Sequence, residues 1–156
     1  MITIGQTPLA NLLEDLLGRE VNLQPVDKVE PHEATYRGMV TDEDDLVAVI
    51  GSDLEFAHTT GAALALIPAG RLDGLDQPDD VLLEIYTEVA NVMSRLVNEA
   101  TIYRTRLDPG VTHSTEALEE VIKSGSMIEA CTATIAGYGT GNLGIWYNPP
   151  AEAFHG

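Results

Sequence analysis

The feature that most constrains the fold is a long amphipathic segment over residues 79–99. Its apolar side chains, read at helical spacing, form one stripe that looks like a core-facing side: Leu82, Ile85, Tyr86, Val89, Val92, Met93 and Leu96. The other stripe carries polar side chains that recur every three or four residues: Glu84, Glu88, Asn91, Arg95 and Asn98. Asp79 and Asp80 suit the positive end of the helix dipole. The segment therefore predicts one long helix with a buried side and an outward side.

Two pairs of short segments predict antiparallel hairpins. Residues 35–40 and 46–50 flank the acidic turn 41–45, and residues 127–135 and 143–147 flank a glycine-rich segment. Further strands are expected at 21–29 and 101–107, and further helices at 7–17, 53–67 and 115–123. Runs of strands separated by helices favour an α+β fold with a mainly antiparallel sheet. We expect residues 1–150 to form one domain, with two long helices packed on one face of the sheet, and residues 151–156 to form a tail.

Several residues predict helix ends. Thr7 suits an N-cap and Pro8 the first helical position, so the first helix is expected to begin there. Gly18 can end this helix in a left-handed conformation. Ser52 or Asp53 can cap the next helix. Small residues in that helix permit close packing against a neighbour: Ala57, Gly61, Ala62, Ala63 and Ala65.

The chain carries a short internal match. Sliding it by 80 residues places Asn11 on Asn91 within similar apolar patterns, and each of these helices leads into a predicted strand. The match predicts a pseudo-twofold repeat, although two amphipathic helices can also match by chance. Pro8 takes the place of Glu88, so only the second helix has an acid one turn before its Asn.

Composition excludes several classes of function. The chain has 156 residues and a net charge of −17, and its eight Lys and Arg residues cannot form a basic patch for nucleic acid or anionic membrane. No apolar run approaches the roughly 18 residues of a spanning helix, and the first residues do not resemble a signal peptide. Cys131 stands alone, which excludes an internal disulfide and fits a reducing compartment. We expect a cytoplasmic protein.

Other motifs favour structure over chemistry. The glycine-rich segment 137–142 lacks the ending of a phosphate-binding loop and predicts a hairpin turn. The turn 41–45 lacks the spacing of a calcium loop and is expected to be exposed. His113 and Ser114 suggest a hydrolase triad, but no nucleophile elbow accompanies them. The histidines are scattered without the spacing of metal ligands: His32, His58, His113 and His155.

A family resemblance covers most of the chain. Glu88-x-x-Asn91 on a helix, the Asn-bearing first helix and the segment Tyr138-Gly-Thr-Gly141 together resemble the CheC/CheX family. The segment from Leu54 to Pro68 also looks like the middle helix of that family. The resemblance implies a bacterial chemotaxis phosphatase that removes the aspartyl phosphate of the response regulator CheY, in two-component signalling.

The resemblance also implies roles for single residues. Asn91 would orient the attacking water, because an amide offers both a donor and an acceptor. Glu88 would pair with a Lys of the CheY-like receiver and dock the helix. The family needs no cofactor of its own, since Mg²⁺ lies in the receiver. Its members can form homodimers through an edge strand.

Two positions on the same face depart from the family pattern. Glu84 stands where Asp or Ser is usual, and Arg95 stands where a small residue is common. Pro109 also comes sooner after Asn91 than the family's downstream proline. Glu84 and Arg95 are candidate binding residues, with Arg95 able to clash with a receiver or to bind its acidic pocket. The alternatives are a receiver-binding module without catalysis, a flagellar or assembly module of the same fold, or an ordinary solvated helix face.

Overall fold

The computed structural model describes residues 3–108 and 112–149. Six strands form one sheet in the order β1-β5-β6-β3-β2-β4, and every neighbouring pair is antiparallel. The strands are β1 (Val21–Pro25), β2 (Arg37–Val40), β3 (Leu46–Ser52), β4 (Arg106–Leu107), β5 (Ser126–Ile135) and β6 (Gly139–Tyr147). The predicted α+β fold with an antiparallel sheet is therefore confirmed. The predicted tail, residues 151–156, lies outside the described residues.

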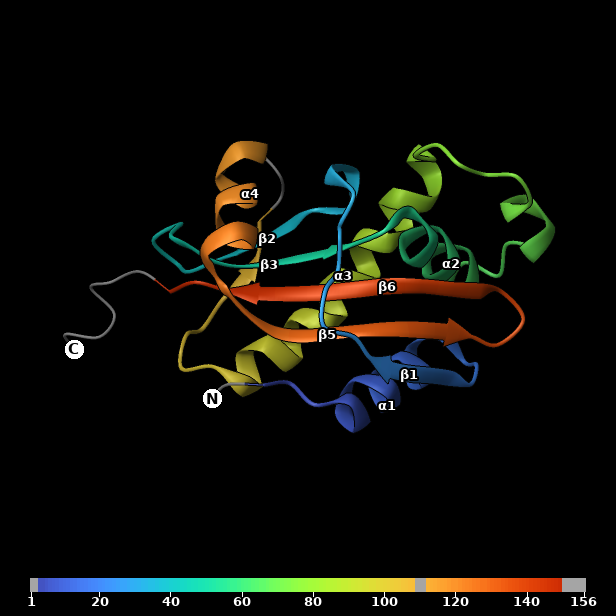
Figure 1. Cartoon of the computed structure of the whole chain (residues 1–156), viewed down its shortest axis with the longest axis horizontal. Coiled ribbons are helices and arrows are strands. Elements are labelled where there is room, and N and C mark those ends of the chain that lie inside the picture. The colour runs from blue at the N-terminus through green and yellow to red at the C-terminus, as the bar shows by residue number, and fades with distance from the viewer. Residues whose placement is uncertain (1–2, 109–111, 150–156) are drawn as a thin grey trace.

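Helices cover both faces of the sheet. They are α1 (Gln6–Leu17), α2 (Leu54–Leu64), α3 (Asp80–Ala100) and α4 (Thr115–Ser124), with short 3-10 helices η1 (Glu33–Thr35) and η2 (Ala69–Leu72). Residues of α1, α2 and α3 share one large core with the sheet, and Figure 1 shows α3 passing behind the strands. A smaller core joins Val121 of α4 to Val49 and Trp146. Because side chains alternate along a strand, these two cores lie on opposite faces of the sheet.

Several element ends differ from the sequence expectations: β1 ends at Pro25 and not at residue 29, and α2 ends at Leu64 and not at residue 67. The first helix begins at Gln6, after Gly5, and Pro8 lies in its first turn, where its missing N–H removes no helical hydrogen bond. The strand expected at 101–107 contains only Arg106 and Leu107, because Thr105 binds Asn98 of α3 instead: the Thr105 N–H donates to Asn98 Oδ1 at 2.8 Å.

Helix α2 approaches its neighbours closely, as its small residues predict. Asp53 caps it by accepting from the Phe56 N–H at 2.9 Å. A Cβ at Gly61 would stand 2.5 Å from the Leu82 carbonyl oxygen of α3, and one at Gly141 would stand 2.2 Å from the Phe56 nitrogen. Gly141 therefore lets β6 pass close to α2.

The hairpin predicted at the glycine-rich segment is present between β5 and β6, and Gly137 in its turn has φ 82°.

The strand order is compatible with an internal repeat. The first half of the chain contributes a helix and then β1, β2 and β3, and the second contributes a helix and then β4, β5 and β6. Exchanging β1 with β4, β2 with β5 and β3 with β6 reverses the order of the sheet and leaves every pairing intact. The two helices differ in length, with 12 residues in α1 and 21 in α3.

No helix within the described ranges combines the length and apolar content that crossing a membrane requires.

Candidate functional site

The candidate site lies on the outward face of α3. Asp79 caps this helix by accepting from the Leu82 N–H at 3.0 Å. Its inner face is buried along its whole length, through Leu82, Leu83, Tyr86, Val89, Ala90, Met93, Ser94, Leu96 and Val97. Ile85 and Val92, which the periodicity placed in the core, are only half-buried and form the border of the outward face. A 100° step per residue leaves such positions between the two stripes.

Four of the five predicted polar residues are exposed together. Glu84, Glu88, Asn91 and Arg95 follow one another along the outer side of α3. Within the described part of the chain, none of their side chains forms a hydrogen bond or an ion pair. Their charged and amide groups are therefore available to a partner.

Asn98 has a different role. It is half-buried, and its side chain makes three hydrogen bonds with Thr105. The amide Nδ2 donates to the Thr105 carbonyl at 3.0 Å, and Oδ1 accepts from both the N–H and the hydroxyl, each at 2.8 Å. Asn98 thus fastens the segment after α3 to the helix.

Glu88 and Asn91 form the most chemical pair on this face. Residues three apart on a helix are neighbours, with Cβ atoms about 5–6 Å apart. The Asn91 amide can donate to one group and accept from another, and its short side chain restricts where it points. Asn disfavours a helix interior, and no contact of the Asn91 side chain within the described residues accounts for its place there.

On α1, the residues that correspond to Glu88 and Asn91 are Pro8 and Asn11. Asn11 is exposed, as Asn91 is, so the two amides are not packed between the helices. Pro8 precedes Asn11 on the surface and supplies no carboxylate. Of these two helices, α3 therefore has an acid one turn before its Asn, whereas α1 has an exposed one only after it, at Asp15.

The opposite side of α3 is held rigidly. Tyr86 is fully buried, its ring stands edge-on to Phe56 at 6.2 Å, and its hydroxyl donates to the Thr35 carbonyl at 3.3 Å. Burial raises the pKa of this phenol to about 12, so it stays protonated. Packing of this kind fixes the position of the exposed side chains on the other side of the helix.

The described histidines do not assemble a metal centre. No group of three or more metal-binding side chains occurs within residues 3–108 and 112–149, and His155 lies outside them. His58 is buried, and its Nε2 accepts from the Asp79 N–H at 3.1 Å. Burial lowers the pKa of His58 and favours the neutral ring that this contact requires.

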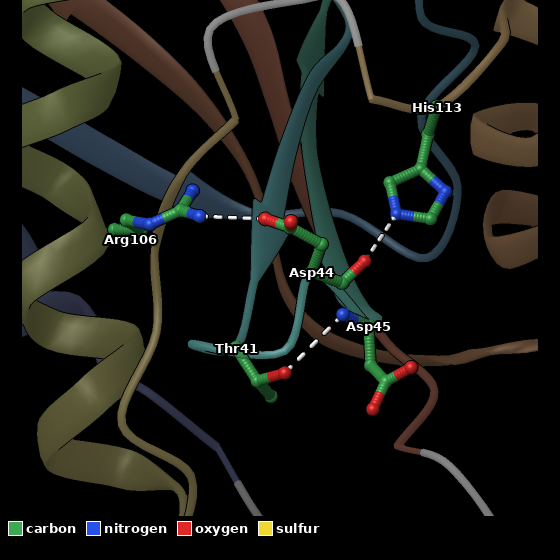
Figure 2. A network of polar contacts seen from close by, with 5 residues as sticks. All are labelled: Thr41, Asp44, Asp45, Arg106 and His113. Atoms are coloured by element: carbon green, nitrogen blue, oxygen red, sulfur yellow. Dashed lines mark hydrogen bonds and ion pairs between the residues drawn. The ribbon is translucent and has the colours of Figure 1, made fainter.

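The acidic turn 41–45 is anchored to the segment after α3. Figure 2 shows the Asp44 carboxylate facing Arg106, at 2.6 Å, while the Asp44 carbonyl faces His113 Nε2 at 2.7 Å. The Asp45 N–H donates to Thr41 Oγ1 at 3.2 Å within the same turn. His113 thereby uses Nε2 to hold this turn in place.

Cys131 is fully buried, and burial raises the pKa of its thiol to about 12, so no reactive thiolate forms near neutral pH.

One feature was not predicted from the sequence. A groove of about 370 Å³ lies between η1, β2, α3 and the beginning of α4. Its lining residues are Glu33, Tyr36, Arg37, Gly38, Thr87, Asp108, His113, Thr115 and Leu118. They come from four separated parts of the chain, so no local motif could have indicated them. Arg37 is a basic residue inside a predicted strand of a very acidic protein, but Lys28 and Arg106 share that property, so it did not single out this groove.

Comparisons with protein-family models, with curated proteins and with solved structures find no match for this chain.

Proposed function

We propose that this protein hydrolyses the aspartyl phosphate of a CheY-like receiver, with Asn91 orienting the attacking water and Glu88 docking the helix. The observation that carries the proposal is the Asn91 amide. It is exposed in the middle of a rigid helix, it has no partner among the described residues, and an exposed acid precedes it by one turn. The sequence resemblance to the CheC/CheX family supplies the reaction.

The geometry favours a protein substrate over a free small molecule. Side chains on a convex helix are surrounded by water and cannot alone form the water-excluded, preorganised environment that stabilises a transition state. A partner that receives the helix in its own pocket supplies that environment. An aspartyl phosphate is an activated acyl phosphate, so placing a water in line is the main remaining task. The receiver's Mg²⁺ would neutralise the phosphoryl oxygens.

Charge supports docking on a partner with a basic patch. Glu84 and Glu88 are exposed on the same face, and the chain carries a net charge of −17. Such a field accelerates encounter with a basic surface and is weakened by salt. Arg95 lies one turn beyond Asn91 and is the cation of this face, placed to meet an acid of the partner. A cytoplasmic location follows from the proposed partner.

A second function has one observation in its favour. Arg95 is exposed and long where the resemblance leads us to expect a small residue. A bulky side chain there would hold the helix away from a receiver pocket and leave binding, or assembly in a flagellar complex, without hydrolysis. The five-residue edge strand β1 is the longer of the two sheet edges and the more suitable one for a homodimer.

Phosphate release from phosphorylated receivers tests the proposal. The substrates are receiver domains encoded near this gene, and the variants are Asn91→Ala and Asn11→Ala. Asn11 is a matched control, because it is also an exposed Asn on a helix, at the repeat position without a preceding acid. We expect Asn91→Ala to lower the rate at least about tenfold and Asn11→Ala to leave it unchanged. Equal rates for all three proteins would exclude catalysis, and stable binding without release would establish the second function.

A further inference from the structure

We propose that the groove beside β2 binds a free α-amino acid, with Arg37 facing the carboxylate and Glu33 and His113 facing the ammonium group. This inference is independent of the phosphatase proposal. The groove lies beside the end of β4, which pairs with β2 before the Asp108 N–H donates to the Gly38 carbonyl at 2.8 Å. Helix α3 bounds the groove at Thr87, and α4 bounds it at Leu118.

Arg37 supplies an uncompensated positive charge. Four of its five N–H groups donate to neutral acceptors, namely Thr87 Oγ1 and the carbonyls of Ala34, Tyr36 and Leu83. Its guanidinium also stacks 5.1 Å from the centre of the Tyr86 ring. No carboxylate of the described residues forms an ion pair with it, although the chain holds 25 acids.

These contacts fix Arg37 but leave its charge unbalanced. Nη2 makes one of the four hydrogen bonds, to the Leu83 carbonyl at 3.3 Å, and keeps a second N–H without a partner among the described residues. A half-buried, unpaired charge is costly, and a ligand carboxylate offsets that cost through a charge-assisted hydrogen bond. The anionic part of a ligand is therefore expected next to Nη2.

The same groove also presents acceptors, which a simple anion would not use. Glu33 is exposed and has no partner among the described residues. His113 directs Nε2 at a carbonyl oxygen, which can only accept, so Nε2 carries a proton and Nδ1 is the ring nitrogen left to act as an acceptor. A carboxylate and an imidazole lone pair together suit an ammonium group.

A zwitterion satisfies both sets of groups. Free phosphate or a simple carboxylic acid would be attracted by Arg37 but repelled by Glu33, whereas a simple amine would leave Arg37 unbalanced. The volume of about 370 Å³ is at the small end of ligand sites, and the Leu118 side chain offers an apolar wall for a ligand side chain. A free amino acid is the smallest common metabolite with this distribution of charge.

Amide chemical-shift titrations of the full chain test this inference, with L-leucine and L-serine as probes. We expect at least one of the two to shift the amides of Tyr36, Gly38, Thr87 and Thr115 with a Kd of about 1 mM or tighter. Isocaproate, which lacks the ammonium of leucine, and isoamylamine, which lacks its carboxylate, should each bind at least about tenfold more weakly.

Two conservative variants separate binding from folding. Glu33→Gln is the informative variant, because Arg37→Met would also remove several internal hydrogen bonds. Its control is Glu116→Gln, which changes an exposed acid outside the groove. Glu33→Gln should raise the Kd about tenfold, and Glu116→Gln should leave it unchanged. The inference is overturned if neither probe shifts the groove amides, if isocaproate binds as tightly as leucine, or if both variants keep the wild-type Kd.

Discussion

Asn91 and Asn98 stand two turns apart on the same helix, on the same predicted face, and they do opposite things. Asn98 is half-buried and makes three hydrogen bonds with Thr105, whereas Asn91 is exposed and its amide has no partner among the described residues. The hydrogen bonds of the Asn98 amide fasten Thr105, in the segment after α3, to the helix. The comparison teaches that the same residue type in the same pattern can serve stability at one position and remain available for chemistry at another.

The substitution Asn91→Ala gives the strongest test of the difference between these two residues. If the amide orients a water, the rate of phosphate release should fall by about tenfold to a hundredfold. The free energy of unfolding should change by no more than about 0.5 kcal/mol, since an exposed side chain without contacts is removed. Release assays and urea denaturation of one preparation measure both quantities, and a large loss of stability would show that Asn91 has a structural role.

Asn98→Ala should give the reverse pattern. The Thr105 N–H and hydroxyl would lose their acceptor in a buried setting, and we expect a loss of about 2–3 kcal/mol in the free energy of unfolding. The rate of phosphate release per folded molecule should stay at the wild-type value. Denaturation curves check the first part. A rate that falls as far as in Asn91→Ala would remove the distinction between the two residues.

Glu88→Gln sharpens the account of the exposed face. Loss of one docking charge should raise KM about three- to tenfold with little change in kcat. The difference from wild type should shrink as salt is added, because exposed charges are screened. Initial rates over a range of receiver concentrations at low and high salt provide the measurement. A fall in kcat at unchanged KM would instead assign Glu88 to the chemical step.

The smallest expected effect is the pH dependence of the free energy of unfolding that comes from His58, which contacts Asp79 at the beginning of α3. Burial lowers the pKa of His58 in the folded chain, so the unfolded chain takes up this proton first, near pH 6.5. Stability from this group is complete above about pH 7.5, begins to fall as pH drops through about 6.5, and keeps falling until the folded-state pKa is passed. His58→Gln retains an acceptor for the Asp79 N–H and should flatten the curve of unfolding free energy against pH. An unchanged slope would contradict this assignment.

The sequence predicted the sheet, both hairpins and the outward position of Glu88 and Asn91, because these follow from periodicity and local turn residues. It did not predict the contact between Asn98 and Thr105. That single contact explains two errors, since it removes Asn98 from the available face and shortens the strand expected at 101–107. Helical spacing places a side chain on a face but says nothing of which segment returns to cover it.

The groove was missed for a related reason. Arg37 and Thr87 are far apart in the sequence, and their contact at 3.1 Å exists only because α3 crosses the end of β2. The predicted beginning of α1 was wrong by two residues, because the N-cap is Gly5, with φ 92°, and not Thr7. Local patterns tolerate such shifts, since several residues near a helix start can occupy the first turn.

The symmetric strand order has a consequence for how such a chain can be built. The pair β3 and β6 lies at the middle of the sheet and is antiparallel, as a twofold axis between the halves requires. A half-length chain with one helix and three strands could meet a second copy of itself along its third strand and form the same sheet as a homodimer. In one continuous chain, by contrast, the two halves need not have the same sequence. Here Glu88 precedes Asn91 on α3, whereas Pro8 holds the matching place before Asn11 on α1.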